Sequence, residues 1–205
     1  VLLTPADNIA GVEEIYAAWA SGTNLPQYPT AANVDTTTKK VPSPVNTGIY
    51  KLYIKLVDSV GNTATCSSPY TYYVDSDAPS ITASAEITEG TSIVSSVTAS
   101  ASDAHSGIET LTYKWINQND ATVLEGAVDD GISIPQSDGV YKIVITAIDK
   151  VTNTVTKTIE NLQVDSIAPI VQFAPLNGEV YQNSYTVNVG ITDEKSGVDK
   201  YYYIW

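Results

Sequence analysis

The sequence predicts an all-β protein built from tandem β-sandwich repeats, and three observations carry this prediction. A frame of Asp, Gly and Trp recurs three times, with the Asp four residues before the Gly and the Trp eight residues after it. The strands that follow alternate apolar and polar residues with a period of two, which is typical of half-buried strands. A second block, two strands joined by a tight polar turn, recurs at an offset of 91 residues. Self-similarity at a fixed period indicates a repeat architecture.

The Asp–Gly–Trp frame contains all three tryptophans of the chain. Its copies span Asp7–Trp19, Asp103–Trp115 and Asp193–Trp205. Just before each frame we expect the second strand of a unit, at residues 1–4, 97–100 and 187–190. Within each frame, alternation places the Trp on one strand face with the residues two and four positions before it. We expect the Trp to be a core anchor between two sheets, because large aromatic side chains dominate core burial, and a sugar-stacking platform is the alternative.

The repeated hairpin block spans Gly48–Thr65 in its first copy and Gly139–Thr156 in its second. Each copy reads as two strands joined by a turn that begins with Asp and ends with Asn, residue types that favour tight turns. Tyr50 and Tyr141 follow the Gly by two residues, where sandwich domains often place a tyrosine corner. The block therefore predicts one half of a sandwich.

Two linkers that read Val-Asp-Ser-x-Ala-Pro follow the hairpins and divide the chain. Proline stops the preceding strand and stiffens the join. The predicted segments are 1–78, lacking its first strand; 79–168, complete with about seven short strands; and 169–205, the first three strands of a further unit. The chain contains no Met, so we expect a mature product or a window on a longer tandem array. Its partial units are completed within a longer chain or by strand exchange between molecules.

The charge balance excludes several classes of partner. The net charge is −13 and all ten basic residues are Lys. This argues against nucleic acid, whose phosphates need a basic patch, and against anionic membrane surfaces. No stretch approaches the length of a transmembrane helix. Cys66 is the single cysteine, so no disulfide forms within the chain, and we expect it to be a small core or strand residue.

The combined pattern resembles a known family. The frame D-x-x-S-G-[VI] with its later Y-x-W, the block D-G-x-Y and the linker V-D-x-x-A-P are similar to those of bacterial immunoglobulin-like repeats. Such repeats occur in adhesin stalks, S-layer proteins and accessory regions of polysaccharide-degrading enzymes. The resemblance implies a Greek-key immunoglobulin-like sandwich, an extracellular location, and neighbouring repeats of the same or identical chains as partners. The first copy departs from the pattern at Ala10 and Ala17.

Catalytic chemistry is expected to be absent. The only histidine, His105, aligns with Ile9 and Lys195 in the other copies, which indicates a solvated loop residue. The nucleophile motif G-x-S-x-G is missing. The acidic pairs Glu13–Glu14 and Asp129–Asp130 are expected to be solvated surface charges rather than a glycosidase pair.

Calcium is the one site that the sequence suggests. Calcium needs several hard oxygen ligands converging from loops. The candidate ligands lie in the linkers and in the loops of the frame: Asp75, Asp77, Asp103, Asp165 and Asp193. The alternative is that each Asp caps a tight turn through its own backbone. We favour this alternative for Asp58 and Asp149 and also for the position of Asp103, where calcium stays as the second interpretation. Asp77 becomes Ile167 in the next linker, so the set is not uniformly repeated.

Two functions follow as hypotheses. The first is a non-catalytic structural segment of a bacterial surface protein or fibre, which acts as a stalk, spacer or S-layer lattice element. The second is a glycan- or ligand-binding accessory module of a secreted adhesin or polysaccharide-degrading enzyme, with cell-wall or host glycans as partners. The second draws on the tyrosines clustered at residues 70–73 and 201–203, and solvent exposure of these tyrosines would favour it.

Overall fold

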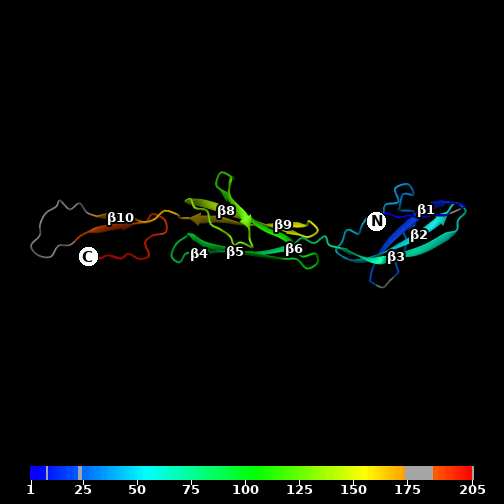
Figure 1. Cartoon of the computed structure of the whole chain (residues 1–205), viewed down its shortest axis with the longest axis horizontal. Coiled ribbons are helices and arrows are strands. Elements are labelled where there is room, and N and C mark those ends of the chain that lie inside the picture. Colours follow the sequence, from blue (N-terminus) through cyan, green and yellow to red (C-terminus); the bar gives the residue numbers. More distant parts are fainter. Residues whose placement is uncertain (8, 23–24, 174–186, 205) are drawn as a thin grey trace, which may run out of the picture. The chain divides into compact units, whose positions relative to one another are not determined.

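The chain folds as antiparallel β-structure. The computed structural model describes residues 1–7, 9–22, 25–173 and 187–204. Within these ranges it has eleven strands in four antiparallel sheets (Figure 1). The prediction of an all-β chain is confirmed. The chain divides into two compact units, Val1–Asp77 and Ala78–Trp205.

The first unit contains one three-stranded sheet in the order β1-β2-β3. Its strands are β1 (Val12–Ser21), β2 (Gly48–Asp58) and β3 (Thr63–Val74). Alternation puts Ile15, Ala17 and Trp19 on the core face of β1, as the sequence predicts. They pack with Leu52 and Ile54 of β2, so the hydrophobic pattern fixes which face of the sheet is buried.

The second unit contains two facing sheets and the larger core. Its strands are β4 (Ser80–Ile87), β5 (Val94–Ser102), β6 (Ile108–Asn117), β7 (Thr122–Ala127), β8 (Gly139–Asp149) and β9 (Thr154–Val164). One sheet is β4-β5 and the other is β7-β6-β8-β9. Val97 of β5, Trp115 of β6 and Ile143 of β8 belong to one buried cluster. Two antiparallel sheets that share a core are compatible with a β-sandwich.

A further hairpin follows within the second unit. It consists of β10 (Ile170–Phe173) and β11 (Val189–Thr192). The predicted alternating strand at 201–205 does not form in the described part, because residues 201–204 are in no sheet and Tyr201–Tyr203 are exposed. A lone strand has no partner for its backbone groups, so alternation alone does not create one. Trp205 lies outside the described residues.

The described tryptophans anchor the cores. Trp115 is fully buried and its indole N–H donates to the Ser133 carbonyl at 2.8 Å. Trp19 is partly buried and donates in the same way to the Pro42 carbonyl at 2.8 Å. Trp115 meets the Tyr141 ring edge-on, with ring centroids 6.3 Å apart, a favourable aromatic geometry. The core-anchor prediction is confirmed for Trp115.

The two units share one irregularity of register. The pairing of β1 with β2 shifts between Val12 and Glu14, and that of β6 with β8 shifts between Ile108 and Thr110, the equivalent place in the repeat. The hairpins β2–β3 and β8–β9 are each irregular as well, but not at the same repeat position: the shift lies between Lys51 and Tyr53 in the first and between Tyr141 and Ile143 in the second. Bulges are specific features rather than random defects, so the shared shift extends the sequence repeat into three dimensions.

One local prediction is wrong, and the other, on Cys66, is confirmed only as to its strand. Residues 1–4 form no strand: Leu2 makes an isolated bridge to Lys40, because this segment pairs with the loop before β2. Cys66 lies in β3, as expected for a strand residue, but it is exposed rather than in the core. β3 is the edge strand of its sheet, where side chains have fewer neighbours.

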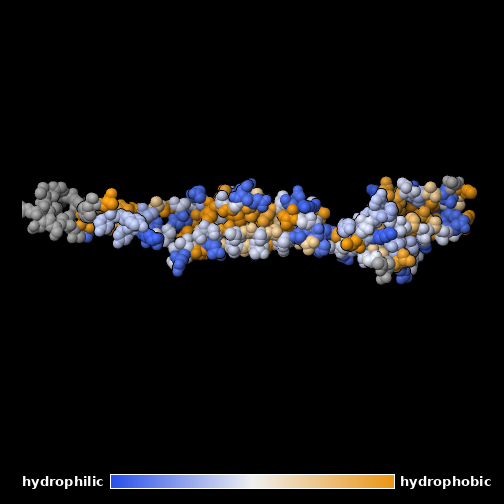
Figure 2. Space-filling model, turned by 60° about the horizontal axis from the view of Figure 1, so that its bottom comes forward, coloured by the Kyte–Doolittle hydropathy of each residue, from blue (hydrophilic) through white to orange (hydrophobic). Residues whose placement is uncertain are grey.

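The hydrophobic residues are only partly covered. Figure 2 shows hydrophobic residues exposed among hydrophilic ones on the visible face of both units. Tyr70 and Tyr73 of β3 are 71% and 79% exposed, whereas Tyr113 and Tyr141 are buried. The tyrosines therefore divide into a core set and a surface set.

Replacing Trp115 with Ala should destabilise the second unit by about 3–5 kcal/mol, because it removes a fully buried aromatic side chain and leaves a cavity. The free energy of unfolding, measured by urea titration, tests this. Trp19→Ala is the matched control, with a smaller loss expected because Trp19 is partly exposed. A loss below about 1 kcal/mol for Trp115→Ala, the size of an ordinary substitution, would contradict the anchor role.

Candidate functional site

The acidic loops between strands are the candidate site, and each is built around one aspartate. Asp103 Oδ1 accepts the backbone N–H groups of His105, Ser106 and Gly107 at 3.0, 2.8 and 2.9 Å. Gly107 has a φ of 79°, which suits glycine and closes the loop. The Gly107 N–H, followed by that of His105, lowers the pKa of the Asp103 carboxyl.

The same loop recurs at the other two copies of the frame. Asp7 Oδ1 accepts three N–H groups at 2.7–2.9 Å, from Ile9, Ala10 and Gly11. Asp193 Oδ1 accepts the N–H groups of Lys195, Ser196 and Gly197 at 3.2, 2.8 and 2.9 Å. Turn capping is therefore the observed role of this Asp in every copy.

The hairpin turns use a second aspartate in a related way. Asp149 is 1% exposed, and its Oδ1 accepts the N–H groups of Val151 and Asn153 at 2.9 and 2.8 Å. The Asn153 amide donates to Oδ2 at 2.7 Å. Burial raises the pKa of Asp149, but hydrogen bonds from Asn153, Val151 and Ser106 outweigh it, so the pKa is lowered. Asp58 has the same pattern with Val60 and Asn62.

The two kinds of loop meet at one end of the second unit. Carboxylate oxygens of Asp103 and Asp149 lie within 4.8 Å of one another. The Lys150 N–H also donates to the Gly107 carbonyl at 3.0 Å. Two ionised carboxylates this close repel each other unless donors or a cation compensate. The N–H groups around both Asp residues supply part of that compensation.

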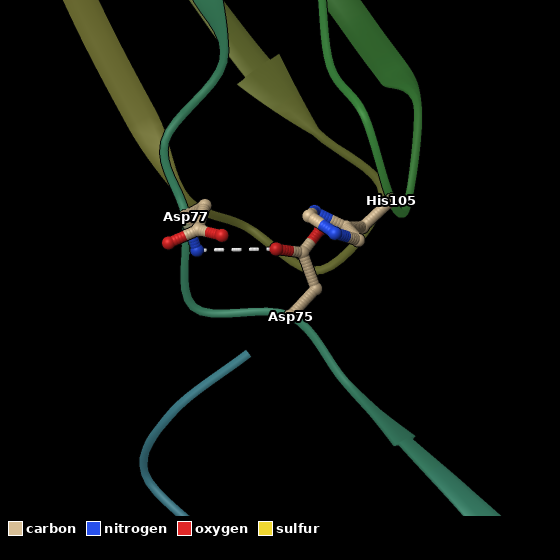
Figure 3. Close-up of side chains that lie close together, drawn as sticks. All are labelled: Asp75, Asp77 and His105. Carbon is tan, nitrogen blue, oxygen red and sulfur yellow. Dashed lines mark hydrogen bonds between the residues drawn. The ribbon is translucent and has the colours of Figure 1, made fainter. Parts of the chain in front are cut away.

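The linker aspartates lie in different units. Asp75 and Asp77 belong to the first unit, where the Asp77 N–H donates to Asp75 Oδ1 at 3.1 Å (Figure 3). Asp165 belongs to the second unit and accepts the Ile167 N–H at 3.1 Å. Its other oxygen accepts the Ser196 N–H at 3.0 Å, and that N–H is shared with Asp193. Of the predicted ligands, the structure thus brings Asp75 next to Asp77 in the first unit and Asp165 next to Asp193 in the second.

As a donor set, these acids offer hard oxygen ligands of the kind that calcium prefers. Oδ1 of Asp103 and Oδ1 of Asp193 already accept three N–H groups each. A cation at either loop would use the second carboxylate oxygen. Calcium binding stays a prediction, whereas the backbone-capping role of these residues is observed.

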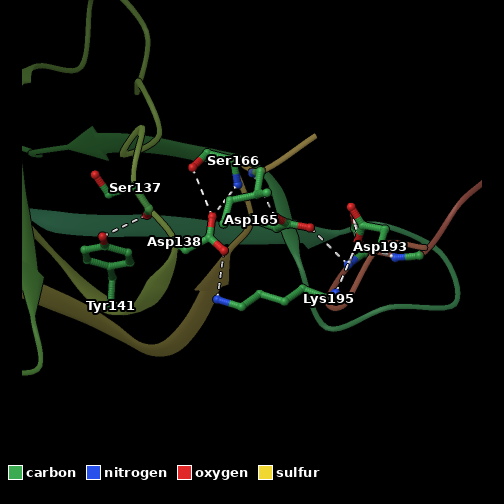
Figure 4. Close-up of polar contacts among 10 residues, drawn as sticks. Ser137, Asp138, Tyr141, Asp165, Ser166, Asp193 and Lys195 are labelled. Atoms are coloured by element: carbon green, nitrogen blue, oxygen red, sulfur yellow. Dashed lines mark hydrogen bonds and ion pairs between the residues drawn. The ribbon is translucent and has the colours of Figure 1, made fainter. Parts of the chain in front are cut away.

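The sequence reasoning missed a polar cluster around Asp138. Its Oδ1 accepts the Ser166 N–H and hydroxyl at 2.8 and 3.0 Å, and its Oδ2 lies 2.9 Å from the Lys195 ammonium (Figure 4). The Ser166 N–H, followed by Lys195, lowers the pKa of Asp138. The repeat comparison gave no signal, because Asp138 aligns with Thr47 and Lys195 aligns with Ile9 and His105.

The remaining catalytic candidates lie at the surface. His105 is exposed in the Asp103 loop, as expected. Glu14, of the first acidic pair, accepts a hydrogen bond from the Tyr16 hydroxyl at 2.8 Å.

Both predicted tyrosine corners are present: Tyr50 donates to the Asn46 carbonyl at 3.0 Å and Tyr141 donates to the Ser137 carbonyl at 2.9 Å. The hydroxyls of these two tyrosines therefore have a structural role: each ties its ring to the backbone four residues earlier.

Comparison with known proteins identifies no family. No protein-family model matches the chain, and no curated protein is significantly similar to it. Among the described residues there is also no helix with the length and hydropathy needed to cross a membrane. The function is therefore inferred from the structure and from the repeats.

The stability of the second unit should depend on the ionisation of Asp149. Its folded pKa is lowered from the ordinary value of 3.8, so the ionised carboxylate stabilises the fold above that pH. This contribution is lost as the pH falls through the lower, folded value. We expect Asp149→Asn to lower the free energy of unfolding near neutral pH and the difference from wild type to shrink in acid.

Urea titrations at a series of pH values from 6 to 2 measure this difference. Asp130→Asn, on an exposed residue, is the matched control and should show little change at any pH. A wild-type minus Asp149→Asn difference that stays constant across the series would show that the carboxylate charge is not the cause.

Proposed function

We propose that the chain is a non-catalytic structural segment of an extracellular bacterial surface protein or fibre, serving as a stalk, spacer or lattice element. In this proposal the units are immunoglobulin-like repeats with Greek-key topology, one complete and two partial. Their partners are neighbouring repeats of the same or identical chains. The predicted boundaries at 78 and 168 belong to the same proposal.

One observation carries this proposal: the two units repeat the same local structure along the chain. The register shift in β1 and β6, the indole-to-carbonyl bonds, the tyrosine corners and the aspartate-capped loops all recur. In these units the repeated polar side chains form hydrogen bonds with backbone groups of the same unit. This use of polar residues is typical of repeat proteins with a structural role. Fold alone supports many functions, so the proposal depends on how these residues are used.

The surface location is tested by antibody labelling of the cells that produce the protein. An antibody against residues 1–205 should label intact cells, and mild protease treatment of intact cells should remove the signal. Labelling that requires permeabilised cells would overturn the proposal. An antibody against a cytoplasmic protein of the same cells is the control for lysis.

A binding module is the second candidate, and the exposed tyrosines favour it. Tyr70 and Tyr73 expose most of their surface on β3, and exposed aromatic rings suit stacking on sugars. The second unit also carries a groove of about 230 Å³ whose lining includes Asn117, Lys142 and Glu160. Binding to a glycan array that is lost in Tyr73→Ala and kept in Val60→Ala, another exposed site, is the outcome that favours this function.

The calcium prediction has a separate test. A ligand that binds only the folded state raises the melting temperature. If calcium binds the acidic loops, the chain should melt at a higher temperature in calcium than in chelator, and Asp103→Asn should reduce this shift. Asp129→Asn, on another surface acid, should leave the shift unchanged. Equal melting temperatures with calcium and with chelator would remove calcium from the proposal.

A further inference from the structure

A polar cluster joins the end of the second unit's core to the loop that follows β11. It contains Asp138, Ser166 and Lys195, which come from three separate segments of the second unit (Figure 4). Asp138 lies in the loop before β8, Ser166 in the linker after β9, and Lys195 in the loop after β11. A cluster of this kind limits how far these three segments move relative to one another.

The backbone next to Asp138 is fixed by a hydrogen bond that involves neither Ser166 nor Lys195. Asp138 follows Ser137, whose carbonyl accepts the Tyr141 hydroxyl at 2.9 Å. Tyr141 is buried in the core and packs edge-on against Trp115. The tyrosine corner therefore ties the backbone beside Asp138 to the most buried part of the unit, and the carboxylate is pre-positioned.

The two oxygens of Asp138 have different partners. Oδ1 accepts two hydrogen bonds from Ser166 of the linker, at 2.8 Å from the N–H and 3.0 Å from the hydroxyl. Oδ2 is buried and accepts no other hydrogen bond among the described residues, but the Lys195 ammonium lies 2.9 Å away. The ion pair is thus the interaction that compensates the burial of this oxygen, and loss of Lys195 would leave it uncompensated.

A second contact joins the same segments. Asp165, next to Ser166, accepts the Ser196 N–H at 3.0 Å through Oδ2. Ser196 follows Lys195 in the loop capped by Asp193. Two adjacent linker residues are therefore bonded on one side to Asp138 and on the other to the loop after β11. Neighbouring contacts on a short linker restrict rotation more than either contact does alone.

The first unit shows a weaker version of this arrangement. At the position of Asp138 it has Thr47, whose hydroxyl oxygen accepts the Ser76 N–H at 2.9 Å. This bond secures the linker, as Asp138 does, but the threonine carries no charge to hold an ammonium group. The comparison of the two copies distinguishes the two interactions of Asp138: Oδ1 binds the linker through Ser166, as Thr47 binds its own linker, whereas Oδ2 binds Lys195 of the loop after β11.

We propose that Asp138 and Lys195 form an electrostatic lock that fixes the orientation of the β10–β11 hairpin relative to the sheets β4-β5 and β7-β6-β8-β9. The lock requires the carboxylate charge, the ammonium charge and the linker bonds of Ser166. A fixed orientation between neighbouring parts of the chain is what a stiff spacer needs, so the biological use of the lock rests on the proposed function. Whether the lock exists does not depend on it. Surface labelling can therefore fail while the lock holds, and the lock can fail while the labelling succeeds.

Residual dipolar couplings of backbone amides in the full chain test the lock. In the wild type, the amides of β4–β9 and those of β10–β11 should fit one common alignment tensor. In Lys195→Ala the two sets should need separate tensors, with smaller couplings in the hairpin. Asp138→Asn, which keeps an oxygen acceptor for Ser166 but removes the charge, should give the same separation.

Matched controls come from a surface ion pair on the same unit. Lys142 lies 2.8 Å from Asp120, and Asp120→Asn should leave the common tensor intact. The amide spectrum of β4–β9 reports whether each variant remains folded. The double variant Asp138→Asn/Lys195→Ala should behave like either single variant, because both remove the same interaction. Separate tensors in the wild type, or a common tensor in Lys195→Ala, would overturn the proposal.

Discussion

The indole N–H bond of the tryptophan is the interaction on which the rest of each unit depends. Trp115 is fully buried in the core of the second unit, and Trp19 packs against the core of the first while staying partly exposed. The indole N–H of each reaches the carbonyl of an irregular segment, Ser133 and Pro42 respectively. A buried N–H without a partner is costly, so the core and the irregular segment must fit together. The loops that carry Asp103 and Asp149 meet at the end of the unit where Ile108 of β6 pairs with Asp149 of β8.

Sequence reasoning succeeded where the determinants are local. Alternation identified the core face of β1 and β6, and the Asp-to-Asn turns set both hairpins. It failed where a partner decides the outcome. Residues 1–4 pair with the loop before β2, and Tyr201–Tyr203 have the alternation of a strand but belong to no sheet. A strand needs a neighbour for its backbone groups, and alternation records only which side chains share a face.

The candidate site divides along the same line. The capping role of Asp103 follows from a local loop motif, and it recurs in every copy because each loop needs it. The Asp138–Lys195 pair brings together residues 57 positions apart, and neither residue type repeats. Residues that repeat are mostly those that each copy needs for its own fold, so a residue found in one copy alone is overlooked. The acidic composition suggests cation binding, but the carboxylates of the repeated loops accept hydrogen bonds from backbone N–H groups.

The hairpin turns show how strongly the repeated hairpin block constrains the backbone. Gly61 adopts a φ of 91° in the first hairpin, and Thr152 adopts 77° at the same place in the second. A β-branched residue is strained in this region, so the turn imposes the conformation whatever residue is present. The backbone N–H groups of Val151 and Asn153, on either side of Thr152, donate to Asp149 Oδ1 and hold the turn in this conformation. A position inside the hairpin block, such as Thr152, thus keeps the backbone geometry of the turn even with an unsuitable residue. The equivalent positions just before the block, Thr47 and Asp138, differ in residue type. Differences between one junction and the next are therefore encoded in the residues that do not repeat.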